Sequence, residues 1–278
     1  MPVLDHTSYP AILDAILAHA DFDALLALRG ASRAYRDRAD TLLTSNVTLA
    51  PARKAPLADG WPATWPALVA LPWGPALPLP PSAVRVLTVP RGVVPQDVGN
   101  DLLDALPGLR VLRLPSAPDT FYPVAPVVVY DVPISCRGTL DAEADRVVIH
   151  LALEGGSWPQ VHADDCAALN VVLWRRGDVP FPAVYGLVLD LLFLPGPVPT
   201  LVGADKLWDG VEEDEAASRF RTGVHERVRL MGADAHLIDL DARLKAITFL
   251  SYARWLDTLG EDRGALDTFR PDTLPYTT

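Results

Sequence analysis

Two short segments of this chain are near-copies of each other. Residues 84–90 read VRVLTVP, and residues 109–115, which begin 25 positions later, read LRVLRLP. Both have the composition of a buried strand, and residues 101–108, ahead of the second copy, have the apolar spacing of a short helix. A strand and a connection of this size cannot cover their own apolar face, so such units stack into one parallel sheet with a continuous core.

Further segments have the composition of strands. They are residues 46–49, 127–132, 146–153, 169–174, 185–193, 227–231 and 245–250. Residues 146–153 (RVVIHLAL) are apolar at nearly every position, which is typical of a strand covered on both faces of a parallel sheet. The alternative is a single α/β domain with helical crossovers, which the short proline-rich connections between several strands do not favour.

The two ends of this strand-rich region have their own patterns. Residues 50–82 are rich in proline and tryptophan and are expected to be irregular. Near the other end, Ser251 is a suitable N-cap for a helix that carries Trp255 and Leu259 and stops at Gly260. A helix in this place would cover the last open face of a stack of repeats.

The first 45 residues have helical periodicity instead. Apolar residues at three- and four-residue spacing predict one helix over residues 10–19, a second from a cap at Asp21 to a stop at Gly30, and a third capped by Ser32. Three short helices bury little apolar surface on their own. A module of this size therefore needs a partner surface or a neighbouring domain to be stable.

The order and spacing of these helical residues resemble an F-box. The resemblance rests on residues 9–13 (YPAIL), 16–17 (IL), 25–29 (LLALR) and 31–36 (ASRAYR). Tyr9 and Tyr35 stand where Leu and Trp are usual in the family, and Ala11 stands where an acidic residue is usual. Both tyrosines keep a large, partly apolar side chain.

This resemblance implies a helix bundle that docks onto the Skp-type adaptor of a cullin-based ubiquitin ligase. The side chains that would bind the adaptor are Tyr9, Pro10, Ile12, Leu13, Ile16, Leu25, Leu28, Arg29, Ser32 and Tyr35. The alternative is that the three helices only cap the domain that follows them. Removing residues 1–45 would then unfold or aggregate the rest of the chain, whereas removing an adaptor-binding module would leave the rest of the chain soluble.

The offset between the two near-copies falls within the roughly 20–29 residues of leucine-rich repeats. The whole arrangement resembles the degenerate leucine-rich-repeat-like domains that follow F-boxes in many fungal proteins. We therefore expect an α/β fold with an F-box-like helical module over residues 8–45. We expect an irregular, leucine-rich-repeat-like solenoid over residues 46–278, with a mostly parallel sheet and a C-terminal capping helix.

The expected function is that of a non-catalytic substrate receptor, which binds a Skp-type adaptor through its first helices and an unknown protein substrate through its second domain. The alternative is a free-standing interaction scaffold. The formal net charge of −11 argues against nucleic acid and anionic membrane as partners. Residues 183–203 are nearly apolar, but Asp190 and three prolines argue against a spanning helix. Two cysteines without a paired motif suit a cytoplasmic or nuclear protein.

No nucleotide, hydrolase or zinc-protease motif is present in the sequence, so we expect no catalytic residue, no cofactor and no metal. In residues 162–166 (HADDC), His162 and Cys166 are four apart, as a helical metal pair would be, with Asp164 and Asp165 between them. Tetrahedral zinc needs three or four protein ligands, and no further ones are signalled nearby. His150 is expected to be a core histidine. Residues 205–215 are expected to form an exposed acidic loop.

Overall fold

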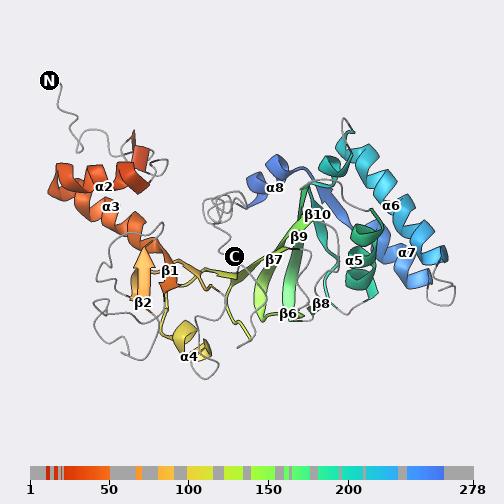
Figure 1. The fold of residues 1–278 in the computed structure, drawn as a ribbon, viewed down its shortest axis with the longest axis horizontal. Coiled ribbons are helices and arrows are strands. Elements are labelled where there is room, and N and C mark those ends of the chain that lie inside the picture. The colour runs from red at the N-terminus through yellow and green to blue at the C-terminus, as the bar shows by residue number, and fades with distance from the viewer. Residues whose placement is uncertain are drawn as a thin grey trace.

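The computed structural model is a mixed α/β fold built on one large sheet (Figure 1). It describes residues 11–12, 16–17, 20, 22–50, 67–70, 81–90, 99–114, 122–133, 139–153, 160–162, 165–175, 181–193, 196–208, 211–230 and 237–259. Within these residues the large sheet has nine strands, of which eight run parallel. The predicted α/β class and the mostly parallel sheet are confirmed.

The described part of the first 45 residues is helical. Residues 11–12 and 16–17 are in helical conformation, and the remainder of the predicted first helix lies outside the described residues. Two longer helices follow, α2 (Phe22–Ala31) and α3 (Arg33–Ser45). The Ser32 hydroxyl accepts a hydrogen bond from the Tyr35 backbone N–H at 3.2 Å, which is the predicted helix cap.

The parallel strands follow one another across the sheet in chain order, so each new strand adds to the same edge. They are β1 (Asn46–Ala50), β3 (Val86–Thr88), β4 (Val111–Leu114), β5 (Val127–Pro133), β7 (Ala144–Leu153), β9 (Cys166–Arg175), β10 (Thr200–Val202) and β11 (Thr248–Leu250). Strand β2 (Ala67–Ala70) pairs antiparallel with β1 at one edge. Strands β6 (Thr139–Asp141) and β8 (Gln160–His162) form a separate parallel pair.

Strands β3 and β4 lie within the two near-copies, and they pair in parallel as neighbours, as the near-repeat predicts. Val86 lies opposite Val111 and Leu87 opposite Leu112, so the sheet register repeats the 25-residue offset of the sequence. Leu87 and Leu112 are fully buried in the same core. Equivalent residues of the two copies thus occupy equivalent places in neighbouring strands.

One face of the sheet, the first face, packs against most of the helices. These are α4 (Gly99–Asp104), α5 (Phe181–Phe193), α6 (Glu213–Leu230) and α7 (Leu237–Ala246), with the 3-10 turns η1 (Pro81–Ala83) and η2 (Ala204–Leu207) in the connections. Helices α4 to α7 and the strands share one apolar core. Within it, the Tyr185 and Phe220 rings meet edge to face at 5.4 Å and join α5 to α6.

The opposite, second face packs against α8 (Tyr252–Thr258), which lies away from α5, α6 and α7 in Figure 1. The Ser251 hydroxyl caps this helix by accepting from the Arg254 N–H at 3.4 Å. Trp255, Leu256 and Leu259 pack onto valines that alternate with the first-face residues along the strands. The helix predicted from Ser251 onward is therefore confirmed.

Several predictions about the second half of the chain were wrong. Residues 185–193 form part of helix α5, although a strand was expected. Short apolar runs are ambiguous between strand and helix, and here Val188, Leu189, Leu191 and Leu192 form a buried helical stripe. Residues 227–230 belong to α6, whose buried Phe220, Val224 and Val228 recur every four residues.

Other boundaries also differ from the expectation. Lys245 and Ala246 end α7, so only residues 248–250 of the predicted strand 245–250 are extended. Residues 67–70 form β2 inside the segment expected to be irregular. The expected acidic loop contains η2 and the first turn of α6, where Glu213 to Glu215 lie at the positive end of the helix dipole.

Candidate partner-binding site

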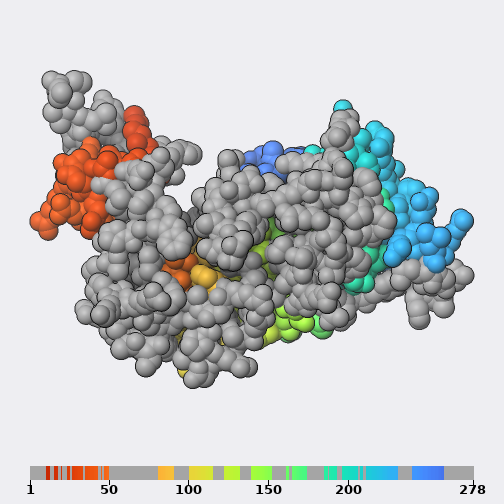
Figure 2. All heavy atoms as spheres, in the orientation of Figure 1, coloured from red at the N-terminus to blue at the C-terminus, as the bar shows by residue number. Residues whose placement is uncertain are grey.

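The N-terminal helices have a small core of their own. Leu17, Leu25 and Ala39 are buried there, and Leu28 and Tyr35 pack against them. This core is separate from the two cores of the sheet. Figure 2 shows the described part of these helices at one end of the molecule. Three of the side chains expected to bind a partner, Leu25, Leu28 and Tyr35, thus contribute to the module itself.

The first helical residues present apolar side chains to solvent. Ile12 is 54% exposed and Ile16 is 48% exposed. Both residues are in helical conformation. The single helix that the sequence predicts over residues 10–19 would place these two isoleucines, four positions apart, on one apolar face. Covering the exposed half of both side chains contributes on the order of 2 kcal/mol to an interaction.

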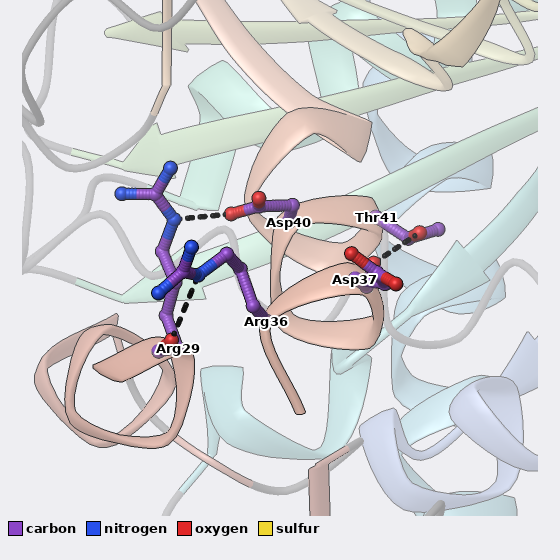
Figure 3. A network of polar contacts seen from close by, with 5 residues as sticks. All are labelled: Arg29, Arg36, Asp37, Asp40 and Thr41. Carbon is purple, nitrogen blue, oxygen red and sulfur yellow. Dashed lines mark hydrogen bonds and ion pairs between the residues drawn. The ribbon is translucent and has the colours of Figure 1, made fainter. Parts of the chain in front are cut away.

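Polar contacts fix α2 against α3 beside this core (Figure 3). The Arg29 guanidinium forms an ion pair with the Asp40 carboxylate, and both side chains are about one-third exposed. Arg36 Nε donates to the Arg29 carbonyl oxygen at 3.3 Å. Within α3, the Thr41 hydroxyl donates to the Asp37 carbonyl oxygen at 2.9 Å. Arg29 and Ser32, both predicted to bind a partner, therefore have structural roles in the helix pair.

The remaining predicted side chains, Tyr9, Pro10 and Leu13, lie outside the described residues. Among the described residues of the predicted site, Ile12 and Ile16 are the two that the structure leaves exposed. The described part of the predicted site thus divides into a buried or partly buried set that holds the module together and an exposed pair, Ile12 and Ile16. Of the described side chains predicted to bind a partner, these two are the most exposed.

A second group of polar residues was not predicted as a group. The buried polar side chains of the described residues all lie on the second face of the sheet, and we name them the polar stripe: Thr48, Thr88, Arg113, Asp131 and His150. Thr48, Thr88 and Arg113 lie side by side in one register row, and Asp131 lies opposite His150 in the next. The signal in the sequence was an arginine inside the apolar run 111–114.

Burial changes the ionisation of this stripe. Burial lowers the pKa of Arg113 to about 10. Burial, followed by the positive charge of Arg113, lowers the pKa of His150 to about 3, so His150 is a neutral imidazole near neutral pH. The Trp255 ring of α8 meets the His150 ring edge to face at 6.2 Å. The stripe is thus buried, and its His150 lies against α8.

The predicted metal-like spacing does not form a helical pair. His162 ends β8, Cys166 is buried at the start of β9, and Asp165 accepts a hydrogen bond from the Tyr122 hydroxyl at 2.9 Å. Over the described ranges, no three His, Cys, Asp or Glu side chains converge as a metal site would require. No helix in the described part of the chain has the length and apolar character needed to span a bilayer.

Comparison with known proteins found no matching family model, no matching curated protein and no matching solved structure.

Proposed function

We propose that this chain is a non-catalytic substrate receptor of a Skp–cullin–F-box ubiquitin ligase, acting in the cytoplasm or nucleus. The observation that carries the proposal is the exposed pair Ile12 and Ile16 on a helical module with its own core. Exposed large apolar side chains at helical spacing are what a helix needs to dock into a partner's apolar groove. The sequence resemblance to an F-box points to a Skp-type adaptor as the partner.

In this proposal the sheet is an irregular leucine-rich-repeat-like solenoid that presents the target protein. Parallel strands in strict chain order support this reading, as does the 25-residue register between β3 and β4. The helices α5, α6 and α7 make its later units longer than its earlier ones. The target is a protein, bound by side chains from several units.

The test is co-expression of the full chain with a Skp-type adaptor, followed by size-exclusion chromatography. We expect a 1:1 complex that the double variant Ile12→Asp/Ile16→Asp abolishes, because two carboxylates would be buried in the apolar contact. Both side chains are half exposed in the free chain, so the variant keeps its fold. Arg33→Asp, on the exposed start of α3, is the control for added negative charge outside the isoleucine pair.

Substitutions in the module core would not serve this purpose. Leu28 packs against Leu25 and Tyr35, so Leu28→Asp damages the module as well as any contact with the adaptor. Separate elution of two folded proteins, with the wild-type chain, would overturn the receptor proposal.

A second candidate, a scaffold whose helices cap the sheet, is favoured by one observation. Helix α3 continues into β1 without a linker, and the Ser45 carbonyl oxygen accepts from the Arg85 N–H at 2.9 Å. The two candidates differ in what Leu25→Ala does. A cap would transmit the damage to the sheet and lower the unfolding midpoint of the whole chain. An adaptor-binding module would lose adaptor capture while the sheet unfolds at its wild-type midpoint.

A further inference from the structure

The large sheet ends at β11, the last strand in its sequential order. Each new unit of the chain adds its parallel strand to the same edge, so β11 presents the edge on which a further strand would form. Within the described residues no strand pairs with the outer side of β11. An open strand edge is a template for pairing with another chain, and monomeric proteins block such edges.

The pairing of β11 with β10 shows which of its backbone groups point outward. The Leu250 carbonyl oxygen accepts from the Gly203 N–H at 2.9 Å, so it points toward β10. The N–H of the same planar peptide unit, which belongs to Ser251, therefore points away from β10. Thr248 faces β10 like Leu250, since strand residues alternate, so the Ile247 carbonyl oxygen also points outward.

Two side chains of α6 occupy these outward groups, one at each end of β11. Arg221 Nη2 donates to the Ile247 carbonyl oxygen at 3.4 Å. Glu213 Oε2 accepts from the Ser251 backbone N–H at 2.9 Å. Arg221 also lies over the Phe249 ring between them, 4.9 Å from its centroid. Helix α6 thus supplies a donor and an acceptor, which are the groups that a neighbouring strand would supply.

The spacing of the two side chains on α6 matches the spacing of the two backbone groups. Glu213 and Arg221 are eight positions apart (213 to 221), which is about 12 Å along a helix. Ile247 and Ser251 are four positions apart (247 to 251), which is about 13 Å along a strand. One helix can therefore reach both ends of this short strand at once.

We propose that Glu213 and Arg221 close the last edge of the sheet, and that they keep β11 from pairing with the β11 strand of a second copy of this chain. A second copy is the partner that the edge fits, because antiparallel pairing about a two-fold axis makes a strand edge complementary to itself. The two edges would meet at Phe249 of each copy, midway between the closed groups. The proposal does not depend on adaptor binding.

Sedimentation velocity of the full chain over a concentration series tests the proposal. We expect a monomeric wild-type chain, and an association constant at least about tenfold higher for Glu213→Ala/Arg221→Ala, because pairing would satisfy the two freed backbone groups. Glu215→Ala/Arg219→Ala removes the same two charges from an exposed ion pair of α6 and should stay monomeric. A wild-type dimer, or a folded Glu213→Ala/Arg221→Ala variant that stays monomeric, would overturn the proposal.

A lysine on β11 tests where the two copies meet. Thr248 is exposed, and a charged side chain on an edge strand disfavours pairing. Adding Thr248→Lys to Glu213→Ala/Arg221→Ala should therefore restore the monomer. Association that persists with this lysine would place the contact elsewhere and would also overturn the proposal.

Hydrogen exchange separates strand pairing from unfolding. Strand β7 lies inside the sheet, so its amides should exchange at the wild-type rate in every variant. If Glu213→Ala/Arg221→Ala exposes the β7 amides, Arg221→Ala alone replaces it, with Arg219→Ala as control and the same deciding outcomes. This single variant leaves the bond from Ser251 to Glu213 in place.

The wild-type chain provides a test that needs no substitution. The Phe249 amide should exchange at least about tenfold faster than the Ser251 amide, whose acceptor is Glu213. Equal, slow exchange of the two amides would show that another part of the chain already covers this edge, and would overturn the proposal. None of these experiments contains an adaptor, so their outcome is separate from that of adaptor capture.

Discussion

Glu213 and Arg254 join the start of α6 to the start of α8 through an ion pair of 2.8 Å between Oε1 and Nη1. The same carboxylate accepts the Ser251 backbone N–H through its other oxygen. Ser251 and Arg254 follow Glu213 by 38 and 41 positions in the sequence, and both are held by its carboxylate. The two bonds are unequal, because the Arg254 side chain is 69% exposed and the Ser251 amide is partly buried.

This inequality predicts different costs for the two partners. Arg254→Ala should lower the free energy of unfolding by less than about 1 kcal/mol, as an exposed ion pair does. Glu213→Ala should cost about 1–3 kcal/mol, because the Ser251 N–H also loses its acceptor. Glu213→Gln retains a carbonyl oxygen and should recover most of that loss. Urea denaturation of the three variants measures the difference, and equal losses for Arg254→Ala and Glu213→Ala would contradict it.

Gly223 of α6 lies where any side chain would meet α5. A Cβ at this position would come within 2.2 Å of the Tyr185 ring. Gly223→Ala should therefore lower the free energy of unfolding by about 1–3 kcal/mol, because the helices must separate or Tyr185 must leave its packing with Phe220. Gly30→Ala is the control, since nothing lies within 4 Å of a Cβ there. It should be neutral or stabilising by up to about 1 kcal/mol in the same thermal or urea measurement.

Leu87 and Leu112 occupy equivalent places in the two near-copies and are both fully buried. Each substitution by alanine should cost about 2–5 kcal/mol, because it removes buried methyl groups and leaves a cavity in a core shared with the first-face helices. Val124→Ala, at an exposed position, should change stability by no more than about 0.5 kcal/mol. Denaturant titration measures all three. A small effect at only one of the two leucines would show that the copies are not structurally equivalent.

His150 predicts a loss of stability in acid. Burial and then Arg113 lower its pKa to about 3 in the folded chain, whereas an unfolded histidine titrates near about 6.5. The unfolded state therefore binds more protons between these values, so stability present above pH ~6.5 falls by about 1.4 kcal/mol per pH unit as the pH drops toward 3. The groups around the imidazole are Arg113 on β4, Asp131 on β5 and Trp255 on α8.

The measurement is the difference in unfolding free energy between wild type and His150→Gln from pH 7 to pH 4. Carboxylates titrate in both chains, so the difference isolates the histidine. His225→Gln is the matched control, because His225 is about half exposed beside Asp241. It should keep the wild-type slope. A wild-type slope in His150→Gln would show that another group causes the acid sensitivity.

The parts of the fold that depend on local signals were predictable. Ser32 and Ser251 cap helices as their positions indicate, because the capping bond involves residues three apart in the chain. The register of β3 against β4 was predictable because two near-identical units pack in the same way. Helix α5 was missed because its apolar residues 185–193 fill most positions, which hides the period that separates a helix from a strand.

The candidate site was predictable only in outline. The sequence placed Ile12, Ile16, Leu25 and Leu28 on apolar helical faces, and periodicity does not state which face meets the module core and which meets solvent. The structure shows Leu25 buried with Leu17 and Ala39, and leaves Ile12 and Ile16 exposed. This distinction decides which substitutions test a partner and which only unfold the module.

The sequence by itself determined the class of this protein: a helical first segment followed by strands that stack in parallel, because helical spacing, caps and a 25-residue near-repeat are written within a few tens of residues. Only the tertiary structure decided that Arg113, Asp131 and His150 share one face of the sheet, on which Trp255 of α8 packs against His150. These residues come from separate strands, and their meeting depends on the register between strands and on which face each helix covers. Register and coverage arise from packing between distant segments, which no local pattern encodes.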